Sequence, residues 1–203
     1  MARKSGSNGE QTARDIRAAA TTLFAAHGYA AVSMRQIAQR VGVQVGALYL
    51  YTPDKQSLLS DLMIDHLEDL LSEWDRARSG VTEPVARLSE FVRFHVRHHL
   101  TRADAVFIAY MELRSLSPEN FSKIERLRRL YETQLEDILH EGAARGTFHL
   151  LDARISTLGL IALLTGVTTW YRDGGRLSPE RIEQVYVAMA LRAVGARQVD
   201  VPA

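Results

Sequence analysis

Three histidines near the middle of the chain have the spacing that metal-binding helices use. His95, His98 and His99 stand at positions i, i+3 and i+4, so a helix would bring their imidazoles to one side. No carboxylate follows within the same helical turns, and arginines lie close by in the sequence: Arg93, Arg97 and Arg102. This setting favours a solvated helix face, and we expect no metal site here.

The chain offers little other chemistry to a catalyst. It contains no cysteine, which excludes disulfides, thiol catalysis and cysteine-ligated zinc or iron–sulfur centres. It also lacks a Glu-x-x-His pair, a nucleophile elbow and a phosphate-binding loop. A helical-bundle enzyme that uses the three histidines stays as one hypothesis. The sequence favours a protein that is not an enzyme and holds no cofactor.

Charge is unevenly distributed along the chain. The 203 residues contain 25 Lys and Arg against 24 Asp and Glu, a net charge of +1. Residues 1–55 contain seven basic and three acidic side chains, a net charge of +4, and the remainder carries −3. This asymmetry indicates a polyanionic partner for the first quarter of the chain. Residues 1–11, which are rich in Ser, Gly, Lys and Arg, are expected to form a flexible basic arm.

Apolar residues recur with a period near 3.6 along almost the whole chain, and no segment alternates as a strand would. We therefore expect an all-α protein of about nine helices in one large or two small domains. Helix-start signals support this, because Ser33–Gln36 is a capping box and Asp54 and Asp152 are suitable caps. The expected helices cover about 12–27, 33–41, 44–50, 54–78, 103–113, 117–144 and 152–171, with two more beginning near 84 and 178.

The stretch Ile37–Leu50 has the pattern of two short helices joined by a tight turn. Ala38 is small where the helices must cross closely, and Gly42 supplies the positive φ that such a turn requires. Leu48 is expected to pack back onto Ile37 and the first helix. In a helix-turn-helix, one helix braces across the DNA backbone and the next presents side chains to the major groove. An ordinary helical hairpin gives the same short pattern.

The wider sequence resembles the TetR family of transcriptional repressors. Four segments match that family in order and spacing over about 45 residues: IRAAATTLFAAHGY (16–29), VSMRQIA (32–38), VGVQVGALY (41–49) and DKQSLL (54–59). The other 145 or so residues match only in kind, as a helical regulatory domain. The resemblance implies a three-helix helix-turn-helix DNA-binding domain over residues 12–55. It implies a ligand-binding and dimerisation domain over residues 56–203.

The resemblance also implies which residues meet double-stranded operator DNA. Tyr49 and Lys55 match positions that contact phosphate, although a tyrosine at 49 would also pack against the domain core. The other expected contacts lie on the bracing and recognition helices: Arg35, Gln44, Val45 and Ala47.

This chain departs from the usual family residues at Gln44, Val45, Ala47 and Thr52. Aliphatic side chains meet thymine methyl groups but cannot hydrogen-bond to base edges. We therefore expect Arg35, Gln44 and Tyr51 to carry more of the base readout than usual. We also expect the Arg3/Lys4 arm to reach a minor groove.

The body of the chain is expected to bind a ligand and to dimerise. The resemblance implies that the last two helices pair with a second subunit, and two-fold symmetry suits a palindromic operator. The alternative is that these helices pack internally. Their small and large apolar residues alternate: Leu158, Ile161, Ala162, Thr165, Gly166, Thr169, Ile182, Val185, Met189 and Ala190. The candidate ligand-binding residues are Trp74, Phe91, Phe94, His95, Phe107, Tyr110, Met111, Arg114, Tyr131 and Trp170. Aromatic residues at helical spacing are more often plain core than pocket lining, and Arg114 would pair either with an acidic ligand or with Glu112 or Glu119.

The small-molecule effector that would control DNA binding is the partner that the sequence defines least. The segment 170–182 (WYRDGGRLSPERI) resembles the same junction in family members that respond to acyl-CoA thioesters, where Arg172 and Arg176 would meet CoA phosphates or simply lie on a surface turn. The favoured function is a ligand-responsive repressor that binds as a homodimer. An architectural DNA-binding protein without an effector is a further alternative. The longest apolar stretch, 158–167, is too short to span a bilayer, so we expect a cytoplasmic protein with no membrane partner.

Overall fold

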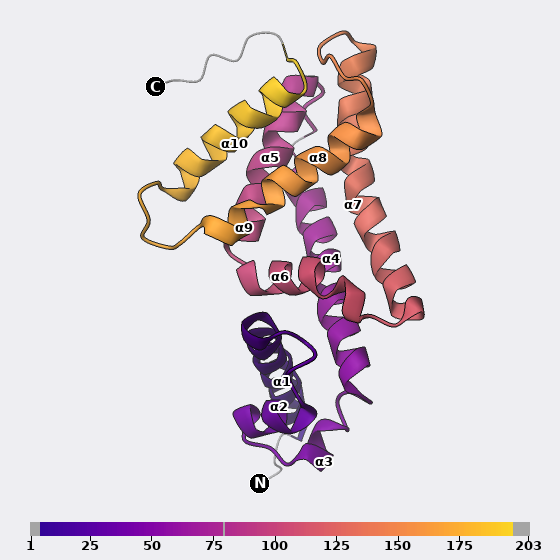
Figure 1. Cartoon of the computed structure of the whole chain (residues 1–203), viewed down its shortest axis with the longest axis vertical. Helices are drawn as coiled ribbons and strands as arrows, with labels where there is room; N and C mark the ends of the chain where they lie inside the picture. Colours follow the sequence, from indigo (N-terminus) through magenta and orange to yellow (C-terminus); the bar gives the residue numbers. More distant parts are fainter. Residues whose placement is uncertain (1–4, 79, 197–203) are drawn as a thin grey trace. The chain divides into compact units, whose positions relative to one another are not determined.

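The computed structural model describes residues 5–78 and 80–196, and the side chains of those residues from position 9 onward. Within this part, the chain forms ten α-helices and one short 3-10 helix (Figure 1). The all-α prediction is confirmed. The helices are α1 (Ser5–His27), α2 (Met34–Val41), α3 (Val45–Leu48), α4 (Lys55–Ala77), α5 (Pro84–Leu100), α6 (Ala103–Met111), η1 (Leu113–Ser115), α7 (Pro118–Ala144), α8 (Ala153–Thr165), α9 (Val167–Trp170) and α10 (Pro179–Ala193).

Two helix boundaries differ from the prediction by more than two residues. The first helix begins at Ser5, so residues 5–11 of the predicted flexible arm are helical; Arg3 and Lys4 lie outside the described residues. The predicted eighth helix is divided at Gly166, which ends α8 and begins α9. This division accounts for ten α-helices where about nine were expected.

The helices form two compact units, each with its own core. The first unit runs to Leu67 and also includes Asp104–Glu125; the second comprises Glu68–Ala103 and the described residues from Arg126 onward. Helices α4 and α7 therefore contribute to both units. Helix α6, η1 and the start of α7 belong to the same unit as the N-terminal helices.

Local capping explains where the helices of the first unit begin and end. Ser33 and Gln36 form the predicted capping box at the start of α2. Asp54 accepts a hydrogen bond of 2.7 Å from the Ser57 amide at the start of α4. That bond stabilises the carboxylate and lowers the pKa of Asp54 from its ordinary value.

The second unit is built around α5. Helix α10 packs along α5, and α8 and α9 also contact α5 (Figure 1). The predicted caps are confirmed: Asp152 accepts from the Ile155 amide, and Ser178 accepts from the Arg181 amide. Contrary to the sequence-based estimate, the stretch Ala153–Trp170 is long and apolar enough by composition to cross a membrane, and 28% of it is buried.

Candidate nucleic-acid interface and regulatory core

The helix-turn-helix is held together by a small buried core. Ile37, Ala38 and Leu48 are fully buried, as predicted, and burial of one leucine contributes about 2 kcal/mol to folding. Gly42 has φ = 78°, and the next amide, that of Val43, donates to the Ala38 carbonyl oxygen at 3.0 Å. This glycine-ended turn fixes the direction in which α3 leaves α2.

The predicted DNA-contacting side chains lie on the outer surface of this motif. Arg35 and Gln44 are exposed, and Val45 and Ala47 are partly exposed. Gln44 occupies the N-cap position of α3, but its side chain makes no capping hydrogen bond. Tyr49 and Tyr51 are 49% and 40% exposed. This surface combines hydrogen-bonding side chains with aromatic ones.

Lys55 has a structural role that the sequence did not indicate. Its Nζ atom donates to the carbonyl oxygens of Tyr29 and Val32, at 2.9 Å each. It also lies 4.2 Å from the centre of the Tyr29 ring, in a cation–π arrangement. The ammonium group therefore ties the start of α4 to the loop between α1 and α2, and two of its three hydrogens are occupied by protein carbonyls.

A second polar network ties α6 and η1 to the same loop, and sequence reasoning missed it. Glu112 accepts from the Tyr29 amide at 2.9 Å and from the Ser115 hydroxyl at 2.7 Å. Gln56, next to Lys55, donates to the Ser115 carbonyl and accepts from the Ser117 amide. The bonds of Glu112 to Tyr29 and of Gln56 to Ser115 and Ser117 join residues more than fifty positions apart, so no local pattern pairs them. The segment after α6 is thus hydrogen-bonded to the base of the helix-turn-helix.

In the second unit, the candidate ligand-binding residues form a packed aromatic cluster. Trp74, Phe91 and Tyr131 are buried, with ring centres 5.1 Å apart for Trp74–Phe91 and 5.2 Å apart for Phe91–Tyr131. His95 is fully buried beside them, with its Nδ1 atom 3.1 Å from the Tyr131 hydroxyl and its Nε2 atom 3.2 Å from the Thr165 hydroxyl. These contacts are those of a hydrogen-bonded core, and ligand binding by this cluster stays a prediction.

The solvated histidine face predicted from the sequence is wrong. His95, His98 and His99 are all buried, and the rings of His95 and His99 stack with centres 3.7 Å apart. The Nδ1 atom of His99 hydrogen-bonds to the His95 carbonyl oxygen at 2.8 Å. Among the described residues, no group of three or more His, Asp or Glu side chains is placed to hold a metal ion. The histidines are packed between helices instead of lining a solvent surface.

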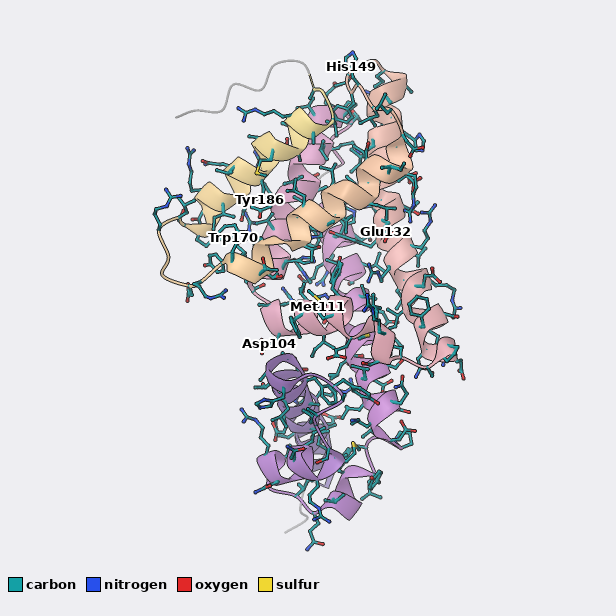
Figure 2. The ribbon with its side chains drawn as sticks, in the orientation of Figure 1. Asp104, Met111, Glu132, His149, Trp170 and Tyr186 are labelled. Atoms are coloured by element: carbon teal, nitrogen blue, oxygen red, sulfur yellow. The ribbon has the colours of Figure 1, made fainter. Side chains whose placement is uncertain are left out.

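Apart from Phe94, whose ring packs against that of Trp74 with centres 5.3 Å apart, the remaining candidates are not part of that cluster. Phe107, Met111 and Arg114 are exposed and Tyr110 is partly buried, on α6 and η1 of the first unit. Trp170, at the end of α9, is 49% exposed and donates its indole N–H to the Tyr186 hydroxyl of α10 at 3.2 Å (Figure 2). Phe94 is partly buried and lines an open groove between α4 and α5.

The sequence of this chain matches known protein families and relatives over most of its length. Residues 16–62 match the family described as "Bacterial regulatory proteins, tetR family", and residues 81–194 match "Tetracyclin repressor-like, C-terminal domain". The HTH-type transcriptional repressor KstR2 of Mycolicibacterium smegmatis is 30% identical over 186 residues, which cover 89% of each chain.

Solved structures agree with this assignment. A bacterial regulatory protein of the tetR family from Rhodococcus RHA1 has a TM-score of 0.87 at 33% identity, covering 92% of this chain and 98% of that one. AibR, crystallised in complex with isovaleryl coenzyme A and operator DNA, has a TM-score of 0.78 at 24% identity, covering 88% and 97%. The chain belongs to the TetR family of helix-turn-helix transcriptional repressors, which bind DNA and are not enzymes.

Proposed function

We propose that this repressor reads a palindromic operator chiefly through Gln44 and the side chains that follow it. The observation that carries the proposal is the exposed surface of α3 and its C-terminal end. Gln44 offers an amide to base edges, and the 83% exposed Leu50 offers methyl contacts; its neighbours in the sequence, Tyr49 and Tyr51, are exposed as well. A glutamine amide pairs well with adenine in the major groove, and tyrosine hydroxyls donate to phosphate.

We infer that the operator is read by a homodimer joined through α8, with α10 beside it. Ile155, Leu158, Gly159 and Ala162, which we call the α8 stripe, are all exposed and follow one another at helical spacing. Ile155 is 70% exposed and Leu158 is 44% exposed. Small residues between large ones favour close contact of two helices. The stripe is not the whole set predicted from the sequence, because Ile161, Thr165, Ile182 and Ala190 are buried within the chain.

A dimer is a better explanation of this apolar surface than a membrane. The stretch that passes the compositional test for a membrane span contains the α8 stripe, and it is broken at Gly166. Arg154 lies next to the stripe in the sequence and pairs with Glu132 at 2.6 Å. A membrane would place this charged side chain in lipid, whereas a second copy of the same face would cover the stripe without doing so. This favours a cytoplasmic homodimer.

We propose an acyl-CoA thioester, or another small hydrophobic molecule, as the effector that releases the operator. Support comes from the exposed Arg172 and Arg176 in the loop between α9 and α10, and from the fold shared with AibR, which was crystallised with isovaleryl coenzyme A. Effector binding would favour a conformation in which two helix-turn-helix units no longer match the half-site spacing.

Selection of duplexes from a random pool tests the DNA-binding proposal. The selected sequence is expected to be a palindrome, and the Gln44→Ala protein is expected to accept any base at one position in each half-site, with a loss of about 1–3 kcal/mol on the original duplex. Fluorescence anisotropy with labelled duplexes measures both affinities, with and without isovaleryl-CoA. Unchanged base preference in the variant would exclude Gln44 from base readout.

Replacement of Gly46 by alanine is expected to change stability and DNA affinity in opposite directions. A Cβ atom at Gly46 would meet no protein atom within 4 Å, so alanine is accommodated in α3. Helix propensity then raises the free energy of unfolding by about 0.5–1 kcal/mol. The added methyl group lies on the face that approaches DNA, so operator affinity falls. Urea unfolding and anisotropy measure the two effects, and a gain in both would place Gly46 outside the DNA contact.

A further inference from the structure

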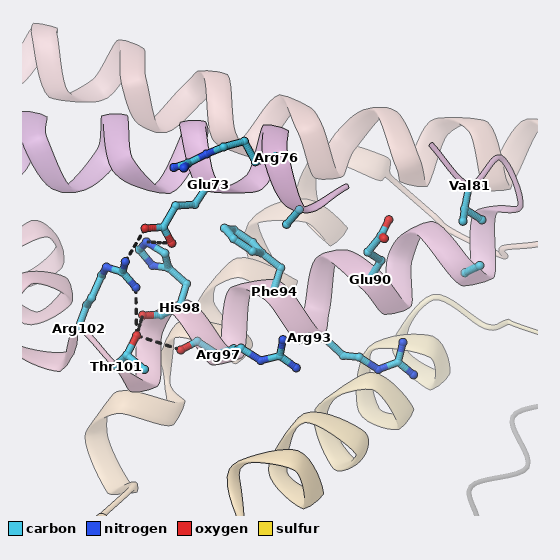
Figure 3. Close-up of a pocket in the computed structure, with 12 residues that line it drawn as sticks. Glu73, Arg76, Val81, Glu90, Arg93, Phe94, Arg97, His98, Thr101 and Arg102 are labelled. Carbon is cyan, nitrogen blue, oxygen red and sulfur yellow. Dashed lines mark hydrogen bonds and ion pairs between the residues drawn. The ribbon is translucent and has the colours of Figure 1, made fainter. Parts of the chain in front are cut away.

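An open groove of about 850 Å³ lies between α4 and α5 in the second unit (Figure 3). Its walls come from the last turns of α4, from α5, and from Val81 in the segment that joins them. We call it the α4–α5 groove. Its volume is within the range of small-molecule sites in proteins, about 300–1,000 Å³. The groove lies on the side of α5 that carries Phe94, not Phe91 or His95, and it adjoins the aromatic cluster at Trp74, whose ring packs against Phe94.

Four arginines line the groove, and they differ in how they are paired. Arg97 makes two hydrogen bonds to Glu183, at 2.9 and 2.7 Å, and Arg102 pairs with Glu73 at 2.5 Å. Arg76 and Arg93 are exposed, and neither forms an ion pair with a carboxylate in the described part of the chain. These two guanidinium groups are therefore the cations that a ligand meets without breaking an ion pair; the Nε atom of Arg76 donates to the Ser72 carbonyl oxygen at 3.2 Å.

The groove also has an apolar wall that is fixed in position. Phe94 projects into it, and its ring packs against the buried Trp74 ring with centres 5.3 Å apart (Figure 3). Ala77, Val81 and Ala86 extend the apolar lining. An aromatic ring held by a buried neighbour loses little freedom when a ligand covers it, which favours binding.

We propose that the α4–α5 groove binds a small organic anion with an apolar body. A guanidinium group matches carboxylate and phosphate oxygens in a two-pronged geometry, and the groove offers one such group from α4, that of Arg76, and one from α5, that of Arg93 (Figure 3). Two carboxylates also line the groove: Glu73, which is paired with Arg102, and Glu90. A neutral hydrophobic molecule would make no charge-assisted hydrogen bond to Arg76 or Arg93, and a free inorganic anion would leave Phe94 uncovered. The ligand class therefore combines a carboxylate or a phosphate with an alkyl or aromatic part.

Calorimetric titration of the full chain tests this proposal. Because DNA is left out, the result does not depend on operator binding. The probes are decanoate, decyl phosphate, acetate and 1-decanol. The groove is expected to prefer one of the two long-chain anions, decanoate or decyl phosphate. That anion should bind at least roughly tenfold more tightly than acetate, which lacks the alkyl chain, and at least roughly tenfold more tightly than 1-decanol, which lacks the charge. Equal binding of decanoate, decyl phosphate and 1-decanol would overturn the proposal.

Two variants locate the site. Arg93→Gln is expected to weaken binding of the preferred anion by roughly tenfold, which is the loss of one charge-assisted hydrogen-bonding partner. Arg126→Gln is the matched control, because Arg126 is an exposed arginine of the same unit that does not line the groove. Equal weakening in the two variants, or none in Arg93→Gln, would place the anion elsewhere. Circular dichroism confirms that both variants are folded.

Discussion

Replacement of Lys55 by methionine is expected to lower the free energy of unfolding by about 2 kcal/mol and to weaken operator binding. The methionine keeps the length of the side chain but leaves the Tyr29 and Val32 carbonyl oxygens without the donor that now lies 2.9 Å from each. Both carbonyls belong to the loop between α1 and α2, so the loss also loosens the position of α2. Urea unfolding measures the first effect, and fluorescence anisotropy on the selected operator measures the second.

The salt dependence of binding separates this structural role from the phosphate contact that the family resemblance implies. A lysine that neutralises one phosphate adds about one unit to the slope of log affinity against log salt concentration. If Lys55 acts by tying the loop, Lys55→Met keeps the slope and lowers stability. Arg35→Gln is the comparison, because Arg35 is exposed. It is expected to reduce the slope and leave stability unchanged. A reduced slope with unchanged stability in Lys55→Met would assign Lys55 to phosphate.

Features that depend on neighbouring residues could be predicted from the sequence. Ser33 and Gln36 are three positions apart, and so are Asp54 and Ser57. The caps that begin α2 and α4 therefore depend only on residues that are close together in the sequence. The turn at Gly42 was predictable because few other residues adopt its positive φ. The helix-turn-helix and its exposed side chains followed from these local signals.

Features that depend on distant residues could not be predicted in the same way. His95 contacts Tyr131 and Thr165, which lie 36 and 70 positions further along the chain. On its own helix, the histidine group appeared to face solvent because the packing helices were unknown. The phosphate contact of Lys55, which the family resemblance implies, stays a prediction; its hydrogen bonds to carbonyl oxygens 23 and 26 positions earlier could not be read from a local pattern. Periodicity shows that a side chain lies on a face, but it does not show what covers that face.

Replacement of Leu158 by glutamate is expected to separate the dimer and to weaken operator binding by at least roughly a hundredfold. Leu158 lies in the middle of the α8 stripe, where a two-fold axis would bring it near its own copy. Burial of an unpaired carboxylate in such a contact costs several kcal/mol, and two copies would repel each other. A monomer also loses the higher operator affinity that results when two DNA-binding domains are linked and bind both half-sites at once. Analytical ultracentrifugation measures the dimer, and fluorescence anisotropy measures operator affinity.

The matched control for this variant is Leu130→Glu. Leu130 is an exposed leucine of the same unit, 55% exposed on α7 and outside the α8 stripe, so the same change of charge should leave both the dimer and operator binding intact. Leu158 is itself 44% exposed within the chain, so neither variant is expected to unfold it. If Leu158→Glu remained a dimer with normal operator affinity, the two subunits would have to join elsewhere. If both variants dissociated, net charge rather than the α8 stripe would control assembly.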